Sequence, residues 1–138
     1  MLSEPRSPIT IFRGDITAMV QVLAITSDLF LESRIEELAK SLGANATVVK
    51  AETDLLREAR SRKPSVVILD LTAEDYDPFS SAQKLKAMEA PPKILAVFPH
   101  IRADLKQRAE KMKIDYIIPN SSFLKTLKIV LEKETRDK

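Results

Sequence analysis

Apolar residues follow two alternating periods along residues 20–135. Five short runs of apolar and β-branched residues predict buried strands at 21–25, 47–49, 66–71, 94–98 and 116–118. After each run, apolar residues recur every three or four positions, which predicts a helix with one buried face. Leu29 belongs to the apolar set of the first helix and Leu124 to that of the last helix. Gly43 and Pro64 are typical of the ends of helices. This strict alternation of strands and helices predicts a parallel sheet that helices cover on both faces.

The number of repeated units limits the architecture. Five strand–helix units are too few for an eightfold barrel, and 138 residues is the size of a single domain. We therefore expect a flavodoxin-like α/β fold, with an open, doubly wound, five-stranded parallel sheet in the order 2-1-3-4-5. Residues 1–19 show no clean periodicity, and we expect them to form a flexible N-terminal extension of a domain at residues 20–135.

The composition speaks against several kinds of site. There is no cysteine for disulfides or thiolate metal sites, and the single His100 cannot build a histidine-rich zinc site. Only two glycines are present, and neither lies in a glycine-rich phosphate loop. A net charge of +2 is too small to indicate nucleic-acid binding, and no apolar run approaches the length of a membrane span. We expect a cytoplasmic protein without nucleic-acid or membrane partners.

Asp70 ends the most apolar run of the chain, Val66-Val67-Ile68-Leu69-Asp70-Leu71. In an open α/β sheet, ligands bind at the carboxyl edge of the strands, which is where this carboxylate is expected. A structural interpretation has Asp70 accepting hydrogen bonds from backbone N–H groups or from Ser27. A functional interpretation makes it an acceptor of phosphate.

From about Gln21 to Lys133, the chain resembles a response-regulator receiver domain, the phosphoacceptor module of two-component signalling. The run that ends in Asp70 is similar to the phosphoacceptor strand, and Asp115-Tyr116-Ile117-Ile118-Pro119 is similar to the fifth strand. The resemblance implies that Asp70 occupies the phosphoacceptor position. It also implies a Mg²⁺ site beside Asp70 and a switch that reports phosphorylation.

The expected phosphorylation pocket departs from the receiver pattern at each supporting position. A working receiver has two acidic residues at the end of its first strand, where this chain has Thr26 and Ser27, followed by Asp28. Phe98 stands where the fourth strand carries a hydroxyl, and Pro119 stands where the fifth strand carries a lysine. Phosphoryl transfer needs metal and cationic or hydroxyl donors around the phosphoryl oxygens.

We therefore predict a degenerate receiver, or pseudo-receiver, that is not an enzyme and has no cofactor and no metal site. Asp28 directly precedes a helical pattern and is expected to cap that helix, although it is also a candidate to replace a lost metal ligand.

Three functions remain open at this point. The first is a phosphorylation-independent module that docks on a partner protein, or on a second copy as a homodimer. We expect docking through the fourth helix, the fifth strand and the fifth helix, at Arg102, Lys106, Tyr116, Lys125 and Lys128. The second is a phosphoacceptor that is phosphorylated on Asp70 with Mg²⁺ held by unusual ligands. The third is a small-ligand binder, because this fold has many functions.

Overall fold

The computed structural model describes residues 20–136, so the expected extension at residues 1–19 lies outside the described part of the chain. The sheet contains five parallel strands in the order β2-β1-β3-β4-β5. The predicted fold class and strand order are confirmed. The strands are β1 (Gln21–Ile25), β2 (Asn45–Val49), β3 (Val66–Asp70), β4 (Lys93–Phe98) and β5 (Tyr116–Pro119).

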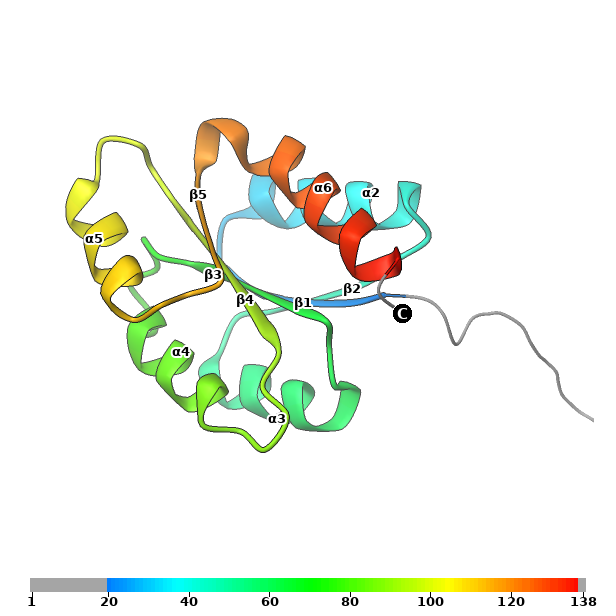
Figure 1. Ribbon diagram of the computed structural model, residues 1–138, viewed down its shortest axis with the longest axis horizontal. Coiled ribbons are helices and arrows are strands. Elements are labelled where there is room, and N and C mark those ends of the chain that lie inside the picture. Colours follow the sequence, from blue (N-terminus) through cyan, green and yellow to red (C-terminus); the bar gives the residue numbers. More distant parts are fainter. Residues whose placement is uncertain (1–19, 137–138) are drawn as a thin grey trace, which may run out of the picture.

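Helices connect successive strands and cover the sheet on both faces (Figure 1). Figure 1 shows α2 and α6 on one face and α3, α4 and α5 on the other. A short 3₁₀ turn, η1 (Asn120–Ser122), separates β5 from α6. The helices are α2 (Leu29–Ser41), α3 (Glu52–Arg62), α4 (Pro78–Lys86), α5 (Ala103–Lys111) and α6 (Phe123–Arg136).

The core has two halves because side chains of a strand alternate between the two faces. On β3, Val66 and Ile68 face α2 and α6, whereas Val67 and Leu69 face the other three helices. The same alternation runs through β1 and β4. Buried strands with apolar residues on both faces match the near-continuous apolar runs of the sequence.

Local sequence signals fix several ends of the helices. Asp28 caps α2 and Asp77 caps α4, each by accepting backbone N–H groups of the first turn. Gly43 follows α2 with a φ of 73°, a conformation that glycine adopts without strain. Among the helices that the structure describes, none has the length and apolar composition that crossing a bilayer requires.

Candidate functional site at the carboxyl edge of the sheet

Asp70 lies at the carboxyl end of the central strand β3, as the sequence predicted, and neutral groups surround its carboxylate. The Thr26 hydroxyl donates to Oδ2 at 2.9 Å. The backbone N–H and the hydroxyl of Thr72 both donate to Oδ1, at 3.0 Å and 2.7 Å. Both carboxylate oxygens therefore have hydrogen-bond partners within the protein, and none of these partners is a cation.

Ser27 is not a partner of Asp70, which corrects one of the two predicted structural arrangements. Its hydroxyl donates instead to the carboxylate of Asp75, at 2.8 Å. The other arrangement, a backbone N–H on Asp70, is present at Thr72. Strand alternation explains the difference: Thr26 continues the face of Val22 and Ala24, and Asp70 continues the same face from Val66 and Ile68.

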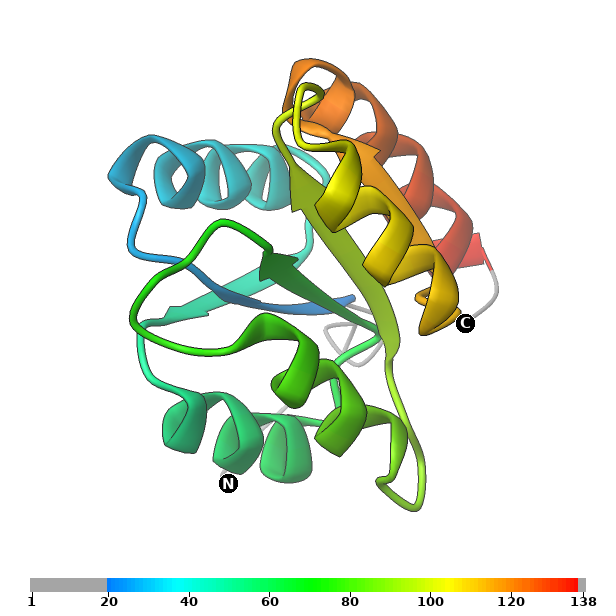
Figure 2. The ribbon, with the colours of Figure 1, turned by 90° about the vertical axis from the view of Figure 1, so that its left-hand side faces the viewer.

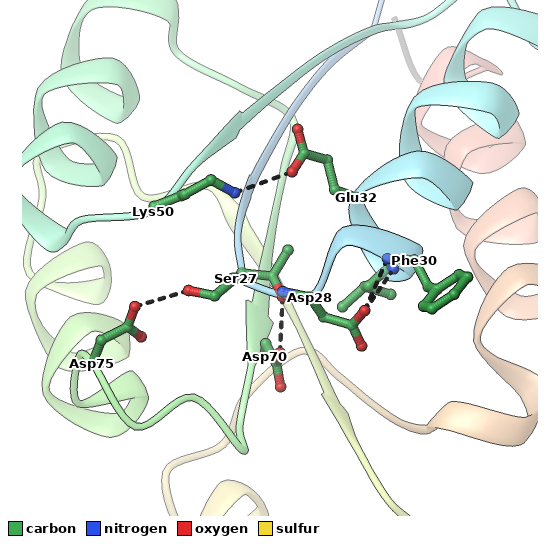
Figure 3. A network of polar contacts seen from close by, with 9 residues as sticks. Ser27, Asp28, Phe30, Glu32, Lys50, Asp70 and Asp75 are labelled. Atoms are coloured by element: carbon green, nitrogen blue, oxygen red, sulfur yellow. Dashed lines mark hydrogen bonds and ion pairs between the residues drawn. The ribbon is translucent and has the colours of Figure 1, made fainter.

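Asp28 acts as the N-cap of α2, as predicted. Its Oδ1 accepts the backbone N–H groups of Phe30 and Leu31, at 2.9 Å and 3.2 Å (Figure 3). Its own backbone N–H donates to the Thr26 hydroxyl oxygen at 3.0 Å. Thr26 thus connects the helix cap to the carboxylate of Asp70.

The residues at this edge do not fit the Mg²⁺ that the receiver resemblance implies. Asp28 is directed at the first turn of α2 and Asp75 at Ser27, so neither carboxylate shares a ligand position with Asp70 (Figure 3). Within residues 20–136, no three acidic or histidine side chains converge as metal ligands would. Mg²⁺ requires near-octahedral oxygen ligands, usually anchored by carboxylates, and Asp70 alone does not supply them.

Tyr76 is a residue of the site that the sequence did not indicate. Its hydroxyl donates to the backbone carbonyl of Asp70 at 2.9 Å and lies 3.5 Å from that of Ile25. Burial of the phenol, with a further contribution from the charge of Asp70, raises its pKa above the ordinary value of 10.0. Tyr76 therefore attaches the loop at residues 71–77 to the ends of β1 and β3.

Phe98 and Pro119 are neighbours at the carboxyl ends of β4 and β5, where they pair in register. The Phe98 side chain is only 3% exposed and belongs to the core cluster that includes Leu71, Phe79 and Leu105. Pro119 has a φ of −68° and a half-buried side chain. The edge thus offers an aromatic core residue and an imino acid at the two positions where the resemblance implies a hydroxyl and a lysine.

Two hollows flank Asp70, one on either side. The first, about 460 Å³, is lined by Ser27, Asp28, Thr72 and Asp75 among others. The second, about 390 Å³, lies towards α6 and is also lined by Arg34 and Asn120, which the sequence did not indicate. Leu29 and Phe30, beside this second hollow, are 71% and 80% exposed, so the assignment of Leu29 to the buried stripe of its helix is wrong.

The predicted interaction face is formed by β5 at one edge of the sheet and by α5 and α6 beside it (Figure 2). Lys106, Lys125 and Lys128 are exposed, and Tyr116 is half-buried. Arg102 pairs with Asp104 at 2.9 Å, and this hydrogen bond lowers the pKa of Asp104 to about 2. On α6, Leu124 and Ile129 are also exposed, although Leu124 was expected to face the core.

Comparison with known proteins identifies the fold. Neither a protein-family model nor a curated protein matches the sequence. Solved structures do match, with 84–86% of this chain covered. A response-regulator receiver domain (CheY-like) from Methylobacillus flagellatus is similar at 25% identity with a TM-score of 0.70, covering 98% of that chain.

Two further structures give the same result. The chemotaxis response regulator CheY4 of Vibrio cholerae has a TM-score of 0.72 at 15% identity, with 98% of that chain covered. A response regulator receiver domain protein from Clostridium thermocellum has a TM-score of 0.74 at 16% identity, with 96% of that chain covered. The chain has the fold of a CheY-like response-regulator receiver domain.

Proposed function

We propose that this chain is a receiver-like signalling module that acts by docking on a protein partner, independently of phosphorylation and without enzymatic activity. The docking face is the surface of α5, β5 and α6 that carries Arg102, Lys106, Tyr116, Lys125 and Lys128. One observation carries the proposal: neutral donors of Thr26 and Thr72 occupy both oxygens of Asp70.

These hydrogen bonds bear directly on phosphorylation. A phosphoryl group on Asp70 adds negative charge, which metal ions or cations must neutralise during transfer. No lysine or arginine within residues 20–136 forms an ion pair with Asp70, and the nearby carboxylates of Asp28 and Asp75 have other partners. Hydroxyl and amide donors stabilise the free carboxylate and supply no such charge.

The groups that surround the site also favour a single conformation. A receiver switch needs two conformations for which a ligand has different affinities, because a ligand with equal affinity for both leaves their populations unchanged. Phe98 is packed in the core, Pro119 has a fixed φ, and Tyr76 holds the loop after β3. A domain of this kind signals by its presence and its binding surface.

The proposed face has the mixture of groups from which interfaces are built. Lys106, Lys125 and Lys128 form no ion pairs among the described residues, and exposed Leu124 and Ile129 lie among the lysines of α6. Arg108 stacks on the ring of Phe79 at 3.9 Å, which holds α5 against α4. A face with unpaired cations and apolar side chains suits a partner with acidic and apolar residues, including a second copy.

The phosphoacceptor function is the second candidate because Asp70 is partly exposed and lines two open hollows. In this alternative, Asp70 is phosphorylated with Mg²⁺ bound by ligands different from those of other receivers.

Treatment of the full chain with acetyl phosphate and Mg²⁺, followed by intact-mass measurement, separates the two functions. We expect no mass gain of one phosphoryl group, in the wild type as in Asp70→Asn, while a receiver with a complete acidic pocket gains this mass in the same buffer. A phosphoryl mass that appears in the wild type and is absent in Asp70→Asn would overturn the proposal.

A further inference from the structure

The sheet has two edges, and they differ in how well they are protected. At one edge, β5 has four residues and ends in Pro119, which lacks a backbone N–H. At the other edge, β2 contains no proline, no glycine and no charged side chain. Prolines, charged side chains and bulges are the usual features that prevent an edge strand from pairing, so β2 is the edge that suits a further strand.

The first and last residues of β2 use their backbone groups to bind β1. The Asn45 N–H donates to the carbonyl of Val20, and the Val49 carbonyl accepts the N–H of Thr26. Because the backbone groups of a strand alternate between its two sides, residues 45, 47 and 49 bond towards β1 and the two residues between them bond outward.

These two residues are Ala46 and Val48, and their N–H and C=O groups are arranged symmetrically about Thr47. A second, antiparallel β2 strand with Thr47 opposite Thr47 places Ala46 of each copy opposite Val48 of the other. Opposite residues of this type exchange both hydrogen bonds, so all four outward groups of each strand find a partner. A shift of the register by two residues would leave one of the two residues without a partner in β2.

The helix beside this edge carries two charges of opposite sign. Glu36 and Lys40 of α2 line an open hollow of about 420 Å³ together with Asn45 and Ala46, so both lie on the side of α2 that faces the edge. Both side chains are exposed, and neither forms an ion pair among residues 20–136. They are four residues apart, which is about one turn of the helix.

Two features fix the position of α2 along β2. Lys50, directly after β2, pairs with Glu32 near the start of α2 at 3.2 Å. The turn at Gly43 joins the end of α2 to the start of β2, so the helix and the strand run in opposite directions. The middle of β2 is therefore level with residues 36–40 of α2.

We infer that two copies of this chain pair through β2 as a two-fold symmetric dimer with one continuous sheet. The two-fold axis passes between the two Thr47 residues. Since this axis is level with residues 36–40 of α2, Glu36 of each copy lies across from Lys40 of the other. The edge is thus complementary to itself both in hydrogen bonds and in charge.

The arrangement leaves room for α2 in both copies. Since α2 connects β1 to β2, it lies over these two strands (Figure 2). Two such helices, each set back from β2 by half a strand spacing, are about 10 Å apart across the axis, which is the separation of packed helices. The pairing also covers the partly exposed side chains of Ala46 and Val48, which lie on the same face as α2.

The pairing uses the edge of the sheet that lies opposite β5. The surface of α5, β5 and α6 stays accessible in both copies, so the dimer presents it twice. A partner with two binding sites would gain affinity from this duplication without any new contact. The pairing itself does not depend on the proposed function, because it involves neither Asp70 nor the surface of α5, β5 and α6.

Sedimentation equilibrium of the full chain tests the charge pairs. We expect the wild type to associate as a dimer, and Glu36→Lys to raise the dissociation constant about tenfold or more, because like charges then meet across the axis. Glu36→Lys combined with Lys40→Glu restores opposite charges and should bring the dissociation constant to within about threefold of the wild type. Glu37→Lys, an exposed neighbour that does not line the hollow, is the matched control and should behave as the wild type.

A single introduced cysteine tests the register. The chain has no cysteine of its own, so Thr47→Cys supplies one thiol per copy. In the inferred register the two Cα atoms at this position are about 4.5 Å apart, which allows a disulfide, and oxidation should give a covalent dimer. Asn45→Cys is the matched control on the same strand, because its two copies lie about four residues apart along the paired strands, too far for a disulfide.

Three outcomes would overturn the inference. The first is a wild type that remains a monomer at a concentration of about 1 mM. The second is association that Glu36→Lys does not weaken, or that the exchange of both charges does not restore. The third is a covalent dimer that forms as readily from Asn45→Cys as from Thr47→Cys. Association that depends on Lys106 and Lys128 and is insensitive to Glu36→Lys would place the second copy on the surface of α5, β5 and α6 instead.

Discussion

Thr26 and Asp70 are joined by a hydrogen bond of 2.9 Å although they are 44 positions apart in the chain. The Thr26 side chain is buried at the end of β1, with 1% exposed, and its hydroxyl also accepts the backbone N–H of Asp28. One neutral side chain therefore stabilises the carboxylate at the centre of the site and supports the cap of α2. In a receiver with a complete pocket, the corresponding region carries acidic residues that would repel this carboxylate.

We expect Thr26→Val to lower the free energy of unfolding by about 2 kcal/mol, because the substitution keeps the side-chain shape and removes a hydrogen bond to a charged group. Urea unfolding followed by circular dichroism measures this change. Thr26→Ser keeps the hydroxyl and loses one methyl group, so it should cost only about 1 kcal/mol. Equal losses in the two variants would show that packing, and not the bond to Asp70, determines the effect.

Two variants of Asp28 test whether this residue acts as a helix cap or as a metal ligand. Asp28→Ala removes the acceptor for Phe30 and Leu31 and should cost about 1 kcal/mol of unfolding free energy. Asp28→Asn retains an oxygen that can cap the helix and should lower the free energy of unfolding by only a few tenths of a kcal/mol. Thermal unfolding of the wild type and both variants, with and without millimolar Mg²⁺, measures these changes. If Mg²⁺ stabilises the wild type and this stabilisation is lost in Asp28→Asn, the assignment of Asp28 as a cap is contradicted.

The sequence was sufficient to predict the sheet and the position of Asp70, because both depend on the spacing of apolar residues. Prediction of the hydrogen-bond partner of Asp70 required one further step. Ser27 and Thr26 are adjacent hydroxyls, and only the alternation of β1 places Thr26 on the same face as Asp70. That signal was available in the sequence, since Val22 and Ala24 precede Thr26 at steps of two.

The contacts of the loop after β3 could not be predicted in the same way. The Tyr76 hydroxyl donates to a backbone carbonyl. Every residue has a backbone carbonyl, so the sequence does not indicate which one accepts the hydrogen bond. Leu29 and Phe30 continue an apolar pattern, yet both are exposed in the first turn of α2. Loop conformation and the position of a helix end are set by tertiary contacts, which periodicity does not describe.

Tyr76 should make stability sensitive to alkaline pH. Its pKa is raised in the folded state by burial, so the folded state retains the phenolic proton that an unfolded chain loses near pH 10. This contribution is complete below pH 10 and is lost as the pH rises above it, by up to about 1.4 kcal/mol per pH unit. Unfolding in urea between pH 8 and about pH 11 measures the slope.

Tyr76→Phe is the matched variant for this measurement. At neutral pH it should cost about 1 kcal/mol, because it removes the hydrogen bond to the Asp70 carbonyl and keeps the ring. Above pH 10, its stability should decline less steeply than that of the wild type. The same alkaline slope in both proteins would place the titrating group elsewhere.

The last prediction concerns the face of α5, β5 and α6. If a second copy docks there, Lys106→Glu combined with Lys128→Glu places two acidic groups where free cations meet the partner, and like charges across an interface are unfavourable. We expect the dissociation constant of the dimer, measured by sedimentation, to rise about tenfold or more, with a stronger effect at low salt because exposed charges are screened. Asp70→Asn should leave the dimer unchanged.

The matched control reverses two exposed cations that lie away from β5, Arg60 on α3 and Lys63 directly after it, and so produces the same change in net charge. Association that weakens equally in the control would indicate a general effect of charge and contradict a defined face. Association that depends on Asp70 and is unaffected by Lys106 and Lys128 would mean that the carboxyl edge governs binding. The two pairs of variants thus distinguish a docking face from a working pocket, because α5, β5 and α6 carry the face whereas Asp70 lies at the end of β3.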